Sequence, residues 1–218
     1  AQDAYAIESL RRAQKAIADG AFKQEIVAVT VATRKGDVIV DTDEQPGKGM
    51  PDKIPTLKAA FAKDGTITAA TSSSISDGAA AIVLTSQSKA DEKGLKAVAR
   101  IVAHAAHAQE PSEFTIAPVG AIQKLLEKTG WSVDDVDLWE VNEAFACVAM
   151  FAMQDIGISH DKINVNGGGT ALGHPIGASG TRIITTLLGA LETQGKKRGI
   201  ASLCIGGGEA TAIAVELI

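Results

Sequence analysis

The second half of the chain alternates between strand-like and helix-like stretches, and this alternation limits the fold more than any other feature of the sequence. Val136–Val141 and Ile200–Ile205 are strand-like, whereas 118–129 and 177–194 carry apolar residues at helical spacing. Alternation of this kind is typical of an α/β protein in which helices cover a sheet. The run 212–218 follows 200–205 after a short loop, which predicts that these last two strands are neighbours.

The composition fits such a layered fold. The 218 residues include 37 Ala and 22 Gly, and side chains this small let helices approach a sheet closely. Hydrophobic residues make up 45% and charged residues 22%, which are ordinary values for a globular protein and argue against disorder. At about 150 residues per domain, this length predicts one large domain or two small ones.

The first half of the chain is less regular. We expect a helix over 3–19 and a hairpin whose strands lie near 27–31 and 38–40. The segment 41–56 carries acidic residues, Pro and Gly, so we interpret it as an irregular excursion. A strand-like stretch follows at 66–70, and the apolar run Gly78–Leu84 is interpreted as a buried strand.

Asn142 opens the first stretch that suggests chemistry, Asn142-Glu143-Ala144-Phe145-Ala146. We place this stretch between the strand 136–141 and a helix over 143–156, and sites are commonly built where strands pass into helices. The alternative is that Asn142 merely caps the helix.

His174 lies in the second stretch, 166–180, which holds six Gly in its fifteen residues. Each Gly costs about 1 kcal/mol against Ala in regular structure, so this density indicates unusual backbone angles or a close approach. The neighbours Gly173 and Pro175 fix the presentation of the imidazole, which makes His174 a candidate base. A phosphate-binding loop is an alternative, but the GxxxxGK[ST] pattern is absent.

Cys204 begins the third stretch, Cys204-Ile205-Gly206-Gly207-Gly208. A thiol at a strand end beside exposed backbone N–H groups suits oxyanion chemistry. The alternative is a buried apolar cysteine, which is the default for Cys147 in its helix. The two Cys lack metal spacing, so we expect no metal site.

These three stretches, in this order, resemble the signatures of the thiolase family, and the segment 64–84 is similar to a family region that lines the coenzyme A channel. The resemblance implies two similar α/β/α halves plus a lid. We therefore expect a partial lid over 1–76, the last strand of the N-terminal half with a linker over 77–96, and a complete C-terminal thiolase domain over 97–218. The family's N-terminal part, which carries the acylated Cys, has no counterpart here, since neither Cys lies in that motif.

The resemblance also implies roles for individual residues. His174 matches the base that activates the nucleophile, and its Nε2 helps to bind the thioester oxygen. Asn142 matches the residue that holds a water in that oxyanion hole. Cys204 matches the cysteine that moves the α-proton of the incoming acyl-CoA, and Gly206 matches the backbone donor of the other oxyanion hole.

Five further positions match the substrate-binding part of the family, near the pantetheine arm: Phe61, Ala69, Ser73, Ala144 and Phe145. For the two Phe, plain core packing is the alternative. Two departures concern the coenzyme A region. Ser76 precedes Asp77 where the family often has Asn, and Pro46-Gly47-Lys48 lies where members often carry an Arg near the nucleotide.

The function implied is reversible Claisen condensation and thiolysis of 3-ketoacyl-CoA, with coenzyme A thioesters as substrates and no cofactor. The alternative is a non-catalytic thiolase-like subunit that binds coenzyme A or lipid, or serves as a scaffold. A binder needs no proton relay, so the joint presence of Asn142, His174 and Cys204 favours the enzyme. A ketoacyl synthase is disfavoured because that class typically lacks the Cys204 stretch.

Partners and location complete the expectations. The net charge of −5 gives no general footprint for nucleic acid, and no apolar run approaches the roughly 20 residues of a membrane span. Two Cys suit a reducing, cytoplasmic compartment. We expect the missing N-terminal half as a partner, a homodimer or homotetramer as the assembly, and no activity from these 218 residues alone.

Overall fold

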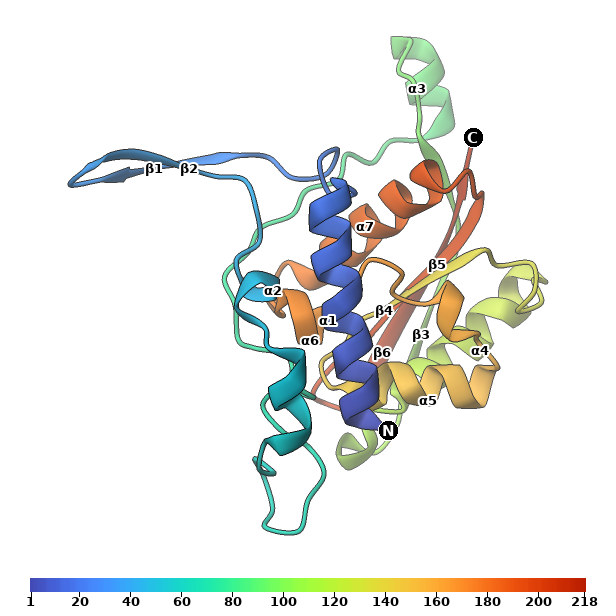
Figure 1. Ribbon diagram of the computed structural model, residues 1–218. Helices are drawn as coiled ribbons and strands as arrows, with labels where there is room; N and C mark the ends of the chain where they lie inside the picture. Colours follow the sequence, from blue (N-terminus) through green and yellow to red (C-terminus); the bar gives the residue numbers. More distant parts are fainter.

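A four-stranded mixed sheet forms the centre of the computed structural model, which describes residues 1–218 (Figure 1). Its strands are β3 (Ala99–Ala108), β4 (Leu138–Val141), β5 (Arg198–Cys204) and β6 (Glu209–Leu217), in the order β3-β6-β5-β4. β6 is antiparallel to both of its neighbours, whereas β4 and β5 are parallel. The expected pairing of the last two strands is confirmed.

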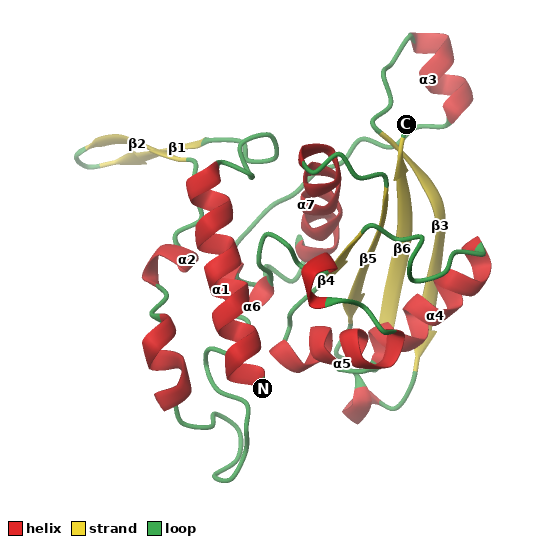
Figure 2. Cartoon of the chain, turned by 45° about the vertical axis from the view of Figure 1, so that its right-hand side comes forward, coloured by secondary structure: helices red, strands yellow, loops and turns green.

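Helices cover both faces of this sheet (Figure 2). On one face α4 (Ala117–Thr129) and α5 (Ala146–Ile156) pack against Ile200, and on the other α7 (Ser179–Thr193) packs against Ala201. Successive residues of β5 thus enter different cores, as the period of two along a strand requires. The layers are helix, sheet and helix, which confirms the expected α/β fold class.

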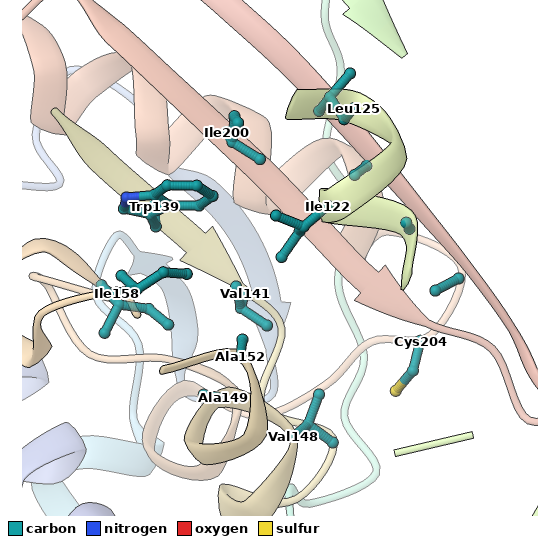
Figure 3. Packing of buried hydrophobic residues seen from close by; sticks show 14 of the residues in the cluster. Ile122, Leu125, Trp139, Val141, Val148, Ala149, Ala152, Ile158, Ile200 and Cys204 are labelled. Carbon is teal, nitrogen blue, oxygen red and sulfur yellow. The ribbon is translucent and has the colours of Figure 1, made fainter. Parts of the chain in front are cut away.

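The larger core is built from a few bulky side chains and many small ones. Trp139 is 1% exposed and lies among Ile122, Val141 and Ile158 (Figure 3). Buried alanines on both sides of the contact let the helices α4 and α5 lie close to the sheet. The helices carry Ala117, Ala121, Ala146, Ala149 and Ala152, and β6 carries Ala210, Ala212 and Ala214.

The N-terminal region is arranged more loosely around helix α1 (Gln2–Asp19), which packs against α5, the short helix α6 (Gly169–Leu172) and residues 51–56. The hairpin β1 (Val29–Thr33) and β2 (Gly36–Val40) projects from the body of the molecule (Figure 1) and has no further strand beside it. The remaining elements are α2 (Gln45–Lys48), α3 (Gln87–Lys93) and the 3₁₀ turns Pro51–Thr56, Pro111–Glu113 and His160–Lys162.

Several expected elements differ from the structure. The stretch 78–84, expected as the last strand of the N-terminal half, forms no strand in this chain and is exposed apart from Ile82. Apolar sequence alone cannot make a strand, because a strand needs a neighbour for its N–H and C=O groups, and none lies beside it. The stretches 66–70 and 163–166 form only isolated bridges, and the helix expected from 143 begins at Ala146.

No helix combines the length and apolar character required to cross a membrane.

Candidate functional site

Two parallel strands carry candidate residues to the same edge of the sheet. β4 ends at Val141 and β5 at Cys204, and Val141 pairs with Ser202. Asn142 follows β4 directly, and its N–H donates to the Ser202 carbonyl at 2.9 Å. Asn142 and Cys204 therefore lie at the carboxyl end of neighbouring strands, which is where α/β sheets place their sites.

Asn142 is not a helix cap, so the capping interpretation is wrong. Helix α5 begins at Ala146, with Phe145 in the extended N-cap position. Asn142 is 1% exposed, and its Nδ2 lies 3.3 Å from His174 Nε2. The residue thus brings an amide from the end of β4 to the imidazole of a distant loop.

The loop that carries His174 is fixed by its backbone. Gly173 has φ +94°, and a Cβ at this position would overlap the Ser76 hydroxyl, so only glycine fits. The His174 N–H donates to the Ser74 carbonyl at 3.0 Å, and Ile75 forms a parallel bridge with His174. The segment around Ser74 therefore holds the loop from the N-terminal side of the chain.

The hydrogen bonds around His174 define its tautomer. Nδ1 lies 2.6 Å from Ser179 Oγ, and the Ser179 hydroxyl donates to the Pro175 carbonyl at 3.0 Å. Since a hydroxyl has one proton, Nδ1–H is the donor to Ser179, and Nε2 keeps its lone pair. The Asn142 amide then donates to Nε2. This arrangement presents a neutral imidazole with its basic nitrogen toward Asn142.

Electrostatics favour the same neutral form. Burial lowers the pKa of His174 below its usual value, and the positive charge of Arg182 lowers it further. Both effects disfavour the imidazolium. His174 is therefore uncharged at neutral pH and able to accept a proton.

Cys204 ends β5 and is 8% exposed, and its sulfur lies on the side of the sheet that α5 covers (Figure 3). Burial raises the pKa of its thiol to about 11. The turn that follows closes through Gly208 N–H to the Ile205 carbonyl, whereas the N–H groups of Gly206 and Gly207 have no partner in the protein. Both glycines are exposed. The edge thus combines a protonated thiol with two free amide donors.

Cys147 differs from Cys204 in its surroundings. It lies half-buried in the first turn of α5, and burial raises the pKa of its thiol. No group of three or more His, Cys, Asp or Glu side chains is arranged to hold a metal ion.

The structure brings four of the five expected substrate-binding positions together. The N–H and the hydroxyl of Ser73 both donate to the Ala144 carbonyl, each at 3.0 Å. The Phe145 ring meets that of Phe61 edge-on, with centroids 6.0 Å apart. Phe61 is 72% exposed, so core packing does not explain it, whereas Phe145 also packs on the larger core. Ala69 is exposed in the preceding turn and makes no hydrogen bond to the other four.

A phosphate-binding role for the Gly-rich stretch is wrong, because a carboxylate already occupies it. The Thr170 N–H at the start of α6 donates to Glu143 Oε2 at 3.1 Å, and the Gly168 N–H donates to Ser9 Oγ at 3.0 Å. A Cβ at Gly168 would overlap the Glu143 carboxyl. The glycines therefore make room for an internal side chain.

Sequence reasoning missed two residues of the site, Glu143 and Ser179. Glu143 is fully buried and accepts hydrogen bonds from four residues. Its place directly after Asn142 was a usable signal. Ser179 lies five residues after His174 at the start of α7, and only the fold brings its hydroxyl to Nδ1.

Comparison with known families agrees with this geometry. The profile described as thiolase, N-terminal domain matches residues 1–88, and that described as thiolase, C-terminal domain matches residues 95–217. The chain therefore belongs to the thiolase family.

Several individual relatives are similar to this chain over its whole length. The acetyl-CoA acetyltransferase of Yarrowia lipolytica is 50% identical and that of Syntrophomonas wolfei 46% identical, each over 100% of this chain. These matches cover 54% and 55% of the two relatives, so the chain spans about half their length. Among solved structures, the Bacillus anthracis acetyl-CoA acetyltransferase superposes with a TM-score of 0.96 at 43% identity. The Ascaris suum thiolase Acat5 in complex with coenzyme A gives 0.93 at 43% identity. Each match covers 100% of this chain and 55% of the other.

Proposed function

We propose that this chain supplies the C-terminal catalytic part of a thiolase that condenses acyl-CoA molecules and cleaves 3-ketoacyl-CoA. The observation that carries the proposal is the neutral His174, whose Nε2 carries the lone pair and faces the Asn142 amide. This base lies at the sheet edge that also bears the Cys204 thiol and the free amides of Gly206 and Gly207. A module that only binds its ligand has no use for such a set.

His174 and Asn142 serve the acyl-transfer half of the reaction. Nε2 accepts the proton of the attacking thiol, a step that general bases commonly accelerate by 10²–10⁴-fold. The protonated ring and a water on Asn142 then donate to the thioester oxygen as negative charge develops there. The nucleophilic thiol comes from outside these 218 residues, since Cys204 is proposed for the other half-reaction and Cys147 does not lie in the family's nucleophile motif.

Cys204 and Gly206 serve the carbon–carbon bond-forming half. Cys204 takes a proton from the α-carbon of the second acyl-CoA, and that carbon attacks the acyl carbonyl while the enzyme thiol leaves. In the resting protein the thiol is protonated, because burial holds its pKa at about 11. It gives this proton to the coenzyme A thiolate that leaves in the first half-reaction, and the resulting thiolate then accepts the α-proton. The Gly206 N–H is the backbone donor of the second oxyanion hole, and one such donor contributes about 3–4 kcal/mol of barrier lowering.

The substrates are coenzyme A thioesters. Ser73, Ala144, Phe145 and Phe61 form a continuous group through the contacts described above, and Ala69 lies in the turn before Ser73. We place the pantetheine arm along this group, with the exposed Phe61 ring available to cover it. The coenzyme A complex of the Ascaris suum relative supports coenzyme A thioesters as the substrates.

The active enzyme requires further protein surface. The stretch 75–84 presents Ile75, Val83 and Leu84 at 95%, 92% and 71% exposure, which is costly for side chains of this size. We propose that this stretch completes a sheet with the N-terminal half of a full-length thiolase and that the assembly is a homo-oligomer.

The test is an assay of the full-length protein that contains this chain. Acetyl-CoA condensation and acetoacetyl-CoA thiolysis are measured with the wild type and with Asn142→Ala as a comparison. Turnover in both directions, reduced in the variant, supports the proposal. A wild type that binds coenzyme A tightly without turnover would instead establish the non-catalytic binding subunit.

A further inference from the structure

Glu143 is a buried carboxylate for which the proposed reaction has no chemical use. It is 0% exposed and lies between the end of β4 and the start of α5. Ionised carboxylates are rarely buried unless several donors compensate them. The donors around Glu143 therefore indicate what it is for.

Each oxygen of Glu143 accepts from fixed donors. Oε1 accepts from Tyr5 Oη and Asn164 Nδ2, each at 2.8 Å. Oε2 accepts from Ser9 Oγ at 2.8 Å, and from the hydroxyl and N–H of Thr170 at 2.6 and 3.1 Å. Burial and the Glu143 charge raise the pKa of Tyr5 well above its usual value, so its hydroxyl remains a donor.

These hydrogen bonds join the segments that carry Asn142 and the His174 loop. Through its own backbone, Glu143 is covalently next to Asn142. Through Thr170 it holds α6, which ends one residue before Gly173 and His174. Through Tyr5 and Ser9 it ties both to α1.

The surrounding backbone is shaped to admit this carboxyl. A Cβ at Gly168 would overlap the Glu143 carboxyl, and one at Gly169 would lie 2.8 Å from the Glu143 carbonyl oxygen. Asn164 has φ +47°, the only non-glycine residue with positive φ, and its side chain bonds Val141 N–H, Val141 C=O and Glu143. A positive φ in a non-glycine residue is unfavourable, and the hydrogen bonds of the Asn164 side chain hold it in this conformation.

We propose that Glu143 is the positioning residue of this site, whose carboxylate holds Asn142 and the His174 loop at the separation that lets Asn142 Nδ2 meet His174 Nε2. This inference rests on the proposed function, because it assigns Glu143 to the same reaction. Glu143 touches neither substrate nor reacting atoms, and it acts only through its two neighbours.

The decisive variant is Glu143→Gln in the full-length protein. A glutamine places an NH₂ group where one carboxylate oxygen was, and that group then faces a fixed N–H donor, from Asn164 on one side or Thr170 on the other. Hydroxyls can turn away, but these N–H groups cannot become acceptors. We expect the His174–Asn142 geometry to loosen and kcat to fall on the order of 10²-fold, with the KM for acetyl-CoA changed by less than about threefold.

Two controls separate positioning from general destabilisation. Leu191→Ala opens the second core at the far end of α7 and lowers the melting temperature without contacting the site. Asp137 precedes β4, at the end of the strand opposite the site, and its carboxylate accepts hydrogen bonds from the N–H groups of Lys197 and Arg198. Asp137→Asn removes the charge of that carboxylate. Assayed below their melting temperatures, both should retain kcat within about threefold, as expected for changes remote from the chemistry.

A spectroscopic readout keeps the test independent of turnover. In the wild type, ¹⁵N NMR of the His174 imidazole should show a single Nδ1–H tautomer, and in Glu143→Gln this preference should be lost. If the wild type lacks turnover, the proposed function fails while this comparison still decides the role of Glu143. A folded Glu143→Gln with unchanged kcat and an unchanged tautomer would overturn the inference.

Milder variants cover the case in which Glu143→Gln does not fold. Thr170→Val and Ser9→Ala each remove a hydroxyl donor to Oε2 and leave the other donors in place. We expect kcat to fall about five- to tenfold in each, at the scale of one weakened hydrogen bond. Wild-type kcat in both variants would equally overturn the inference.

Discussion

The segments 1–96 and 97–218 differ in where their large apolar side chains lie. Of the eighteen large hydrophobic residues that are exposed, thirteen precede residue 97, whereas 27 of the 35 buried hydrophobic residues follow it. The later segment therefore closes its own core around a sheet, and the earlier one keeps apolar surface available for other contacts.

The two segments also differ in the proposed roles of their residues. The groups proposed for the chemical steps, on Asn142, His174 and Cys204, all belong to 97–218, where packing fixes their positions. Positions proposed to contact coenzyme A come partly from 1–96, as with Phe61 and Ser73. The two segments meet through polar bonds, such as those from Ser73 to Ala144 and from Ser9 to Glu143, and through an apolar cluster that packs α1 against Ala171.

The largest expected effect is the loss of all turnover in residues 1–218 expressed alone. The chain should associate or aggregate, because the exposed stretch 75–84 and the hairpin present apolar surface and unpaired strand edges. Size-exclusion chromatography with condensation and thiolysis assays measures this, and adding the N-terminal part of the full-length protein should restore activity. If residues 1–218 were monomeric and catalytically active, the proposal that the segment 1–96 needs further protein surface would be contradicted.

His174→Ala in the full-length protein should lower acyl transfer by at least about 10²-fold, the usual scale for a general base. Steady-state kinetics in both directions measures the effect. Exposed His104 supplies the control, since His104→Ala should leave the rates unchanged. Near wild-type turnover without His174 would contradict its assignment.

Cys204→Ser should impair condensation and leave the first acylation intact, because this thiol is proposed to move the α-proton. Single-turnover labelling with acyl-CoA separates the two steps. Cys147→Ala is the matched control and should leave both steps nearly unchanged. Equal losses of acylation and condensation in Cys204→Ser would argue against the proton-transfer role.

Substitutions in the core and in the hairpin should change the free energy of unfolding by different amounts. Leu187→Ala removes a fully buried side chain from the second core and should cost about 2–5 kcal/mol. Ile39→Thr, on the hairpin at 66% exposure, should change the free energy of unfolding by less than about 0.5 kcal/mol. Urea unfolding of the full-length protein tests both. A large loss in Ile39→Thr would show that an assembly contact covers the hairpin.

The smallest expected effect concerns pH. His174 acts as a base only when neutral, and its pKa is lowered, so the acid limb of kcat/KM should lie below pH 6.5. Arg182→Met removes one cause of that lowering and should move the limb toward higher pH. Burial raises the pKa of the neighbouring Glu140 to about 8, so this carboxyl is neutral at pH 7 and needs no counter-charge. Arg11→Met, on the exposed face of α1, is the control and should leave the profile unchanged.

The helices and the adjacent final strands could be predicted because they depend on local periodicity and on a short connection. The expected strand 78–84 could not be judged in this way, since a strand exists only through a partner. The roles of Asn142 and His174 came from their family stretches, but their 3.3 Å contact depends on residues 32 positions apart. Ser179 escaped notice because a hydroxyl at the start of a helix has no distinctive pattern, whereas Glu143 offered one signal, its place directly after Asn142.

The sequence by itself determined the α/β class, the order of the elements and the stretches that bear the candidate chemistry, because hydrophobic period and glycine placement act over a few residues. The tertiary structure alone decided which proton His174 carries and why the stretch 166–180 is rich in glycine. Both depend on side chains brought from elsewhere: Ser179 and Asn142 set the imidazole tautomer, and the buried Glu143 carboxyl occupies the space left at Gly168. Low dielectric and fixed donors make such contacts decisive, and they arise only when the chain has folded.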